Sequence, residues 1–181
     1  PYYTTVTILA DKEEIGSYGN TGLSSDFVLH YLEDLASLEG ANIRTLLRNT
    51  TALSSDVNGA FDPTFASVYE ERNSCFVNKG RCLTKYTGAR GKSGSNDASA
   101  ETMAKIISIM GEAKVYWQIG ELGAVDEGGG GTVALYVAAM DVDVVDLGVP
   151  VLCMHSPFEL TSKLDVYYTY KAFAAFLASD K

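Results

Sequence analysis

The sequence is poor in the residues that build disulfide scaffolds, zinc knuckles and membrane spans. Its 181 residues include three cysteines and two histidines, and the cysteines lack the paired spacing of a zinc knuckle. We expect Cys75, Cys82 and Cys153 to be reduced, partly buried side chains, which suits a cytoplasmic setting. No apolar run is long enough to span a bilayer, and no signal-peptide pattern is present at the start, so we expect no membrane partner.

Basic residues are also scarce. Lys and Arg number 14 against 23 Asp and Glu, which gives a net charge of −9 and argues against a nucleic-acid partner. The hydrophobic fraction of 46% and the length are those of one globular domain with a real core. Because the chain opens with Pro1 and not Met, we expect it to be part of a longer protein or a processed product.

Strand-like runs alternate with amphipathic helical segments along the chain. This alternation predicts an α/β layered domain. The irregular stretches 61–79 and 88–97 contain proline or several glycines and are predicted to be loops. We predict strands over residues 4–10, 52–57, 81–86, 115–119, 142–147 and 151–154, and helices over about 25–39, 43–47, 99–110, 132–140 and 162–179.

Two adjacent carboxylates, Glu13 and Glu14, directly follow the first predicted strand. Like charges this close repel, so one pKa should rise unless a cation lies nearby. A metal site would remove the conflict, because one Glu would bind the metal while the other moved a proton. The alternative is a solvated acidic turn, since acidic side chains are mostly exposed.

Further candidate ligands stand where other strand-like runs end. Asp56 and His155 each close such a run, and ligand sites in open α/β sheets gather at the carboxyl ends of strands. Carboxylates with one imidazole suit Zn²⁺, Mn²⁺ or Co²⁺, which makes a metallohydrolase a plausible interpretation. His30 lies inside a predicted amphipathic helix and is expected to be structural. Asp146, before a glycine, is expected to be a turn residue or a residue that supports the ligands.

Four consecutive glycines, residues 128–131, precede a predicted helix. They do not fit the dinucleotide fingerprint, because Val133 stands where its third glycine should be. They could bring backbone N–H groups close to a ligand at the helix start, or they could form a flexible turn.

Taken together, these segments resemble the aspartyl aminopeptidase family of metallo-aminopeptidases over nearly the whole chain. Residues 11–17 (DKEEIGS) are similar to its double-Glu motif, and residues 54–58 (SSDVN) to its segment with a metal-binding Asp. Residues 145–150 (VDLGVP), followed by 154–156 (MHS), resemble its closing signature. The glycine run resembles the loop before that signature.

The resemblance implies a three-layer αβα zinc-peptidase-like domain with a mixed sheet, and a dinuclear metal site for removing N-terminal, possibly acidic, residues from peptides. Zn²⁺ would be the most common metal, with Co²⁺ or Mn²⁺ as alternatives. The implied roles are Glu13 as general base, Glu14, Asp56 and His155 as metal ligands, and Lys85, Gly129, Gly130 and Met154 as substrate-binding residues. Lys85 would attract an acidic side chain, or is simply an exposed strand lysine.

The family also has parts that this sequence does not contain. An upstream His and a metal-bridging Asp complete its site, and a dimerisation domain is inserted upstream. We therefore expect residues 1–181 to be the C-terminal segment of the catalytic domain, inactive alone and completed by the upstream part of the same protein. The family's dodecameric shells imply a homo-oligomer for the full enzyme. The alternatives are a non-catalytic assembly fragment and a hydrolase with other peptide or acyl substrates.

Overall fold

The protein folds around one long strand in a mixed sheet. A computed structural model describes residues 1–88, 94 and 96–181, so part of the predicted loop 88–97 lies outside the described residues. The central strand is β5, Asp143–Leu152, and the strand order on the main path is β1-β5-β3-β4. The other strands are β1 (Thr51–Ser54), β2 (Val57–Gly59), β3 (Arg81–Thr84), β4 (Trp117–Ile119) and β6 (Leu160–Thr161).

The two halves of β5 pair with different strands. The first half runs parallel to β1, and the second half pairs with β2 in parallel and with β6 in antiparallel register. We predicted two strands here, separated by Gly148 and Pro150, and that prediction is wrong. Gly148 does not break β5, since its lack of a side chain admits Asn58 of β2: a Cβ on Gly148 would lie 2.9 Å from the Asn58 Cβ.

In the described part of the chain, five α-helices form close to their predicted positions. Asn42, Ser99 and Ser162 cap three of them by accepting hydrogen bonds from backbone N–H groups in the first turn. The helices are α1 (Phe27–Leu38), α2 (Ile43–Arg48), α3 (Ala100–Glu112), α4 (Ala134–Ala138) and α5 (Lys163–Ala178), and short 3-10 turns are formed by η1 (Glu13–Ile15), η2 (Pro63–Val68) and η3 (Glu71–Asn73).

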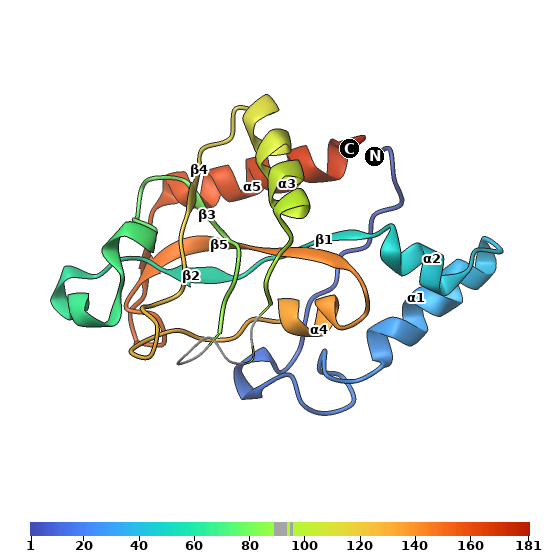
Figure 1. The fold of residues 1–181 in the computed structure, drawn as a ribbon, viewed down its shortest axis with the longest axis horizontal. Helices are drawn as coiled ribbons and strands as arrows, with labels where there is room; N and C mark the ends of the chain where they lie inside the picture. Colours follow the sequence, from blue (N-terminus) through green and yellow to red (C-terminus); the bar gives the residue numbers. More distant parts are fainter. Residues whose placement is uncertain (89–93, 95) are drawn as a thin grey trace.

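The main core lies between the sheet and helices α3 and α5. Val145 and Leu147 of β5 pack there with Ile106 and Met110 of α3 and with Ala172 of α5. Burying each large side chain of this set contributes roughly 1.5–3 kcal/mol. Figure 1 shows α4 on the opposite side of β5 from α3 and α5. The predicted α/β class with a mixed sheet is therefore confirmed.

A buried charge lies beneath this core. The Arg81 side chain donates hydrogen bonds to the carbonyls of Leu147 and Thr169 and stacks 4.8 Å from the Phe173 ring centroid. Burial lowers the pKa of Arg81 to about 9, because the charged form loses its hydration. Arg81 thus anchors α5 to the sheet through backbone acceptors.

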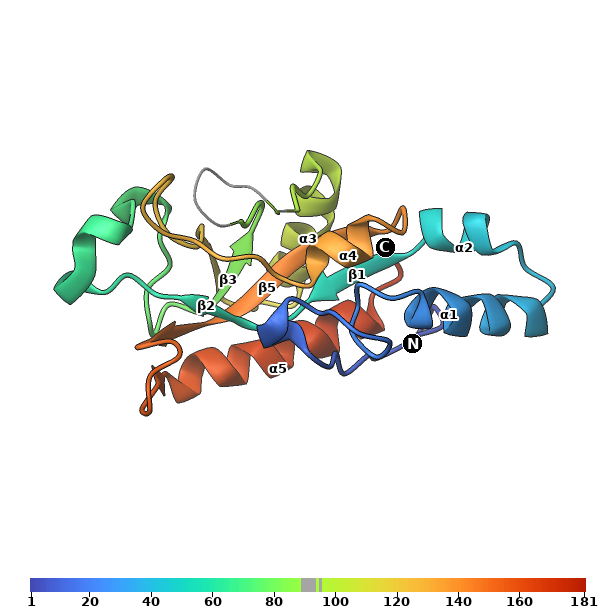
Figure 2. The ribbon, with the colours of Figure 1, turned by 90° about the horizontal axis from the view of Figure 1, so that it is seen from below.

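Residues 4–10 do not form the strand that their alternating pattern predicted. They pair with no strand among the described residues, and the side chains of Val6, Ile8 and Leu9 are exposed. A strand needs a neighbouring edge to satisfy its backbone groups, and this segment has none here. The N- and C-terminal segments lie side by side, joined by a hydrogen bond from the Tyr3 hydroxyl to the Asp180 carbonyl (Figures 1 and 2). Within the described parts of the chain, no helix has the length and apolar character needed to cross a bilayer.

Candidate active site

The adjacent glutamates lie in η1, a single 3-10 turn, and not at the end of a strand. Lys12 before the turn and Gly16 after it both have left-handed backbone angles, which reverse the chain tightly. The Gly16 carbonyl accepts a hydrogen bond of 2.8 Å from the Tyr136 hydroxyl of α4. Glu13 is half-buried and Glu14 is exposed. The turn therefore presents one carboxylate to solvent and holds the other partly inside.

Asp56 lies in the two-residue gap between β1 and β2. The sequence predicted one continuous strand over residues 52–57 instead of these two strands. One of the Asp56 carboxylate oxygens accepts a 2.7 Å hydrogen bond from the backbone N–H of Val57. Its carbonyl accepts another from Val149 of β5, at 3.0 Å. The backbone position of Asp56 is thus fixed by the central strand.

His155 lies three residues beyond the end of β5. Cys153 and His155 both have positive φ angles, 59° and 66°, in the loop that turns back into β6. The His155 N–H donates to the Glu159 carboxylate at 2.5 Å. The ring Nε2 lies 3.8 Å from a carboxylate oxygen of Glu14, so two predicted ligands from opposite ends of the chain are neighbours.

The other three predicted site residues act on the pKa of Glu13. The pKa of Glu13 is raised, first by partial burial and then by the negative charges of Asp56 and Glu14, while His155 acts in the opposite direction. However, the described residues contain no group of three His, Cys, Asp or Glu side chains placed to hold a metal ion. The donor chemistry of carboxylates beside an imidazole suits zinc, and Glu14 and His155 are two predicted ligands that the structure brings close together.

The predicted substrate-binding residues have structural partners of their own. Lys85 follows β3 and forms an ion pair with Asp97. Gly129 has a φ of 115°, and a Cβ there would lie 2.3 Å from the Gly88 carbonyl oxygen. Its neighbour Gly130 accepts a hydrogen bond from the Gly88 N–H. Met154 is half-buried beside Gly59 of β2. The glycines therefore allow a close backbone approach, and α4 begins only at Ala134.

One buried carboxylate was given only a general role from the sequence. Asp146 is at the centre of β5, opposite Ser54 of β1 and Thr84 of β3. Burial raises its pKa to about 6, while the nearby hydroxyls of Ser54 and Thr132 favour the charged form and Asp56 disfavours it. The sequence carries no local signal for these contacts, because Ser54 and Asp56 lie about ninety positions before Asp146.

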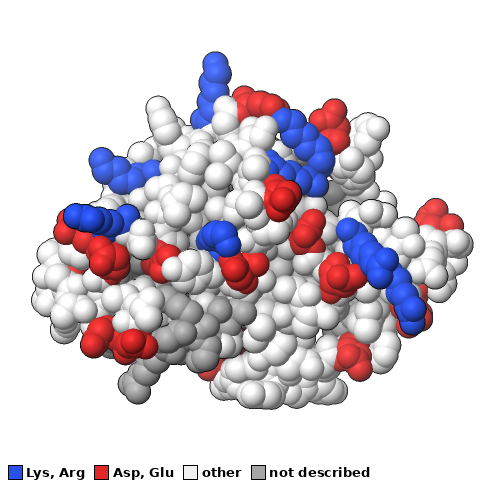
Figure 3. Space-filling view, in the orientation of Figure 1, with Lys and Arg blue, Asp and Glu red and all other residues white. Residues whose placement is uncertain are grey.

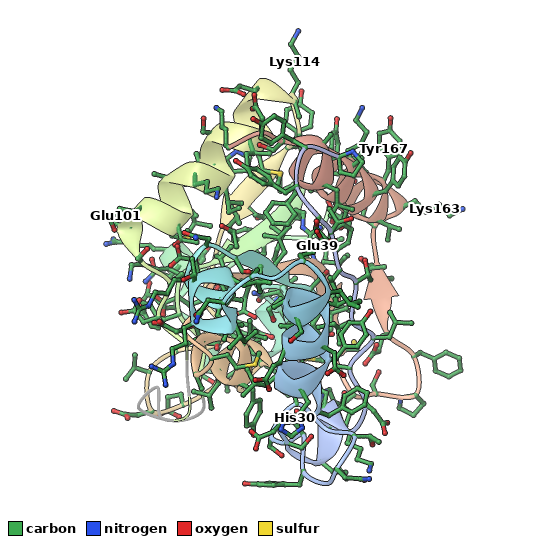
Figure 4. The ribbon with its side chains drawn as sticks, turned by 90° about the vertical axis from the view of Figure 1, so that its right-hand side faces the viewer. His30, Glu39, Glu101, Lys114, Lys163 and Tyr167 are labelled. Atoms are coloured by element: carbon green, nitrogen blue, oxygen red, sulfur yellow. The ribbon has the colours of Figure 1, made fainter. Side chains whose placement is uncertain are left out.

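Two other predictions concern side chains away from these glutamates. His30 is exposed on α1, as Figure 4 shows, which agrees with its exclusion from the site. Cys75 and Cys82 are buried free thiols, whereas Cys153 is exposed and not partly buried as predicted.

Figure 3 shows acidic and basic side chains interspersed over one face of the molecule.

A surface pocket of about 530 Å³ lies between α1, α2 and α4. Leu29, Leu47 and Met140 supply apolar surface there, and Arg48 and Asp141 form an ion pair of 3.0 Å beside them. None of the predicted catalytic or metal-binding residues lines it.

An open mixed sheet that brings a Glu carboxylate near an imidazole beyond a strand end presents donor groups of the kind that zinc enzymes use. A family model described as aminopeptidase I zinc metalloprotease (M18) matches residues 2–177. The chain therefore belongs to the M18 family of zinc metallopeptidases, which confirms the family resemblance inferred from the motifs.

Curated relatives and solved structures agree with this assignment. The chain is 48% identical over 178 residues to a probable M18 family aminopeptidase 1 of Clostridium acetobutylicum, covering 96% of this chain and 38% of that protein. A crystal structure of the M18 aminopeptidase of Thermotoga maritima, 43% identical, superposes with a TM-score of 0.88 over 93% of this chain and 38% of the other. The chain thus spans about two fifths of the length of these relatives.

Proposed function

We propose that the full-length protein is a metal-dependent aminopeptidase and that this chain supplies its general base and part of its metal site. The observation that carries this proposal is the 3.8 Å approach of His155 to Glu14, with Glu13 adjacent in the same turn. These residues come from opposite ends of the chain and have no structural need to meet, since both side chains are largely exposed. A shared ligand is a physical reason for their proximity.

Glu14, Asp56 and His155 would hold the metal, with the remaining ligands supplied by the upstream part of the same protein. Zinc is the metal named for the family, and the donor set suits it, with Co²⁺ or Mn²⁺ as alternatives and two ions in the complete site. When bound, the metal supplies Lewis-acid polarisation of the scissile carbonyl and an acidified water. The Val57 N–H fixes one oxygen of Asp56 and leaves the other free to bind.

Glu13 would act as the general base. Its carboxylate is partly buried and lies among other negative charges, and both effects raise its pKa towards the operating range of a base. It would take a proton from the attacking water and later pass it to the leaving amine. Glu14, which is more exposed, would bind the metal.

Lys85, Gly129, Gly130 and Met154 would contact the substrate. Because Lys85 is already paired with Asp97, an acidic N-terminal residue would have to replace Asp97 at the ammonium group. We therefore propose that any preference for acidic residues is modest in this protein. The preference is set by competition between the substrate carboxylate and Asp97.

The assembled enzyme would be a homo-oligomer acting on peptides in the cytoplasm. One neighbour in fold is the yeast mApe1 dodecamer, which is 23% identical to this chain. A second candidate function is a non-catalytic assembly fragment. It is favoured by the lack of a three-donor metal group among the described residues.

The full-length protein tests both candidates. We expect it to bind zinc and to cleave aminoacyl amides, and Glu13→Gln to lower kcat by about 10²–10⁴-fold while zinc content stays unchanged. Glu14→Gln, the same change one residue away, should instead lower zinc content. Full activity in Glu13→Gln would refute the general-base role. Absence of zinc and activity in the wild type would favour the assembly fragment.

A further inference from the structure

A small cavity of about 10 Å³ lies directly beneath Asp56, inside the sheet. Its lining includes Ser54, Asp56, Asn58, Thr87 and Asp146, from three separate segments of the chain. A space of this size holds one water molecule when two to four polar groups face it. The cavity is therefore the right size and the right chemistry for one small polar occupant.

Among the described residues, three oxygen atoms that line this cavity make no hydrogen bond of standard geometry, although the Ser54 hydroxyl lies near enough to Asp146 to favour its charged form. They are Oδ2 of Asp146, Oγ of Ser54 and Oγ1 of Thr87. Their residues are only 5%, 5% and 1% exposed, so bulk water does not reach them. Each unsatisfied buried polar group costs about 1–3 kcal/mol, and a carboxylate costs more. Three such atoms around one cavity indicate a bound molecule that satisfies them together.

The position of the cavity links it to the proposed metal ligand. Asp146 and Asp56 both line it, and two carboxylates that face one small space repel each other. A neutral molecule with two O–H donors can give one hydrogen to each carboxylate and accept a hydrogen from a hydroxyl of Ser54 or Thr87. Water has this pattern of donors and acceptors, and the cavity has no room for a larger molecule.

We propose that this cavity binds one ordered water molecule, and that Asp146 is a positioning residue that orients the Asp56 carboxylate through it. This inference deepens the proposed function, because it rests on Asp56 being a metal ligand. Residues that orient a metal ligand typically change metal affinity by about 10–100-fold when they are replaced. Asp146 itself would not touch the metal or the substrate.

The water is tested by a crystal structure of the metal-free full-length protein at about 1.5 Å resolution. We expect one density peak within about 3.2 Å of Asp146 Oδ2 and of a hydroxyl of Ser54 or Thr87. An empty cavity, or one filled by a side chain, would overturn the proposal. This result does not depend on metal binding or activity, so it is separate from a failure of the proposed function.

The positioning role is tested by zinc titration of full-length variants. Asp146→Asn keeps the side-chain volume, and we expect its zinc dissociation constant to rise about 10–100-fold, with activity restored by excess zinc. The control is Asp143→Asn, the same change at an exposed position on β5, which should bind zinc like the wild type. Thr87→Val removes a hydroxyl without changing charge and should weaken zinc binding in the same direction as Asp146→Asn.

The measured results separate positioning from a merely structural role. We expect Asp146→Asn to weaken zinc binding without lowering the thermal midpoint of the metal-free protein. Unchanged zinc affinity in Asp146→Asn and Thr87→Val would overturn the positioning role. Loss of folding in Asp146→Asn together with unchanged zinc affinity in Thr87→Val would overturn it as well.

Discussion

Replacing Asp146 by Asn is expected to make the metal-free protein more stable at neutral pH. The carboxyl has a pKa of about 6 in the folded chain against 3.8 in its ordinary state, because burial disfavours its charge. This difference in pKa corresponds to about 3 kcal/mol of unfavourable free energy when the group is ionised. Asn has the same shape, and its amide can donate to the unpartnered hydroxyls of Ser54 or Thr87.

The stability gained by Asp146→Asn should increase with pH. The folded state holds a proton on Asp146 that the unfolded state releases, so the penalty is complete above pH 6 and disappears as the pH falls towards 3.8. Asp146→Asn should therefore gain up to about 3 kcal/mol over the wild type at pH 8 and almost nothing at pH 4. A bound water that donates to the carboxylate would reduce the gain, since it would solvate the charge.

Urea unfolding of the metal-free full-length protein and of the variant, measured from pH 4 to pH 8, checks this expectation. The difference between the two free energies of unfolding is the quantity of interest, since shared effects of pH on other groups cancel in it. Asp143→Asn on the same strand serves as the control and should show no pH-dependent difference. A variant that is less stable than the wild type at pH 8 would refute the assignment of a buried, destabilising charge.

Three further predictions concern other contacts. Asp165 is fully buried and accepts hydrogen bonds of 2.6 and 2.8 Å from the backbone N–H groups of Asn78 and Gly80. Asp165→Ala should therefore lower the free energy of unfolding in urea by about 3–5 kcal/mol, and a loss below about 1 kcal/mol would contradict this. Gly129→Ala should lower the thermal midpoint, since its Cβ would meet a backbone oxygen at 2.3 Å, whereas Gly131→Ala, with its nearest atom at 3.5 Å, should not. Asp97→Asn frees Lys85 and should raise kcat/KM for acidic over neutral N-terminal residues by about 5-fold, the value of an exposed ion pair; an unchanged ratio would exclude Lys85 from the substrate site.

The long helices could be predicted from sequence, because their signals are local. The apolar spacing lies within α3 and α5, and the capping residues Ser99 and Ser162 directly precede them, so no distant contact was needed. The strands were harder to predict. Gly148 predicts the end of a strand, yet glycine is present there because Asn58, ninety residues earlier, packs against its backbone. Residues 4–10 have a strand pattern but no edge to pair with in the described chain.

For the candidate site, too, the residues could be predicted from local sequence, but the contacts between them could not. Glu13, Glu14, Asp56 and His155 could be proposed from strand-like runs and family motifs, but the approach of His155 to Glu14 depends on where the chain turns. The left-handed angle at Lys12 is not signalled by its residue type, whereas histidine, as at position 155, adopts this conformation more often than most residues. The buried cavity could not be predicted at all, because its unpartnered atoms become neighbours only when β1 and β5 pair.

The continuity of β5 has a consequence for the local unfolding of the segments that carry the candidate site. The Val149 N–H of this strand donates a hydrogen bond to the Asp56 carbonyl, so the contact that fixes Asp56 should show the slow amide hydrogen exchange of β5. The glutamate turn instead depends on a few contacts such as the Tyr136 hydroxyl, and its amides should exchange much faster. The two sides of the site would then differ in local opening free energy, which lets the base side adjust to a substrate while the spacing of the other ligands is kept.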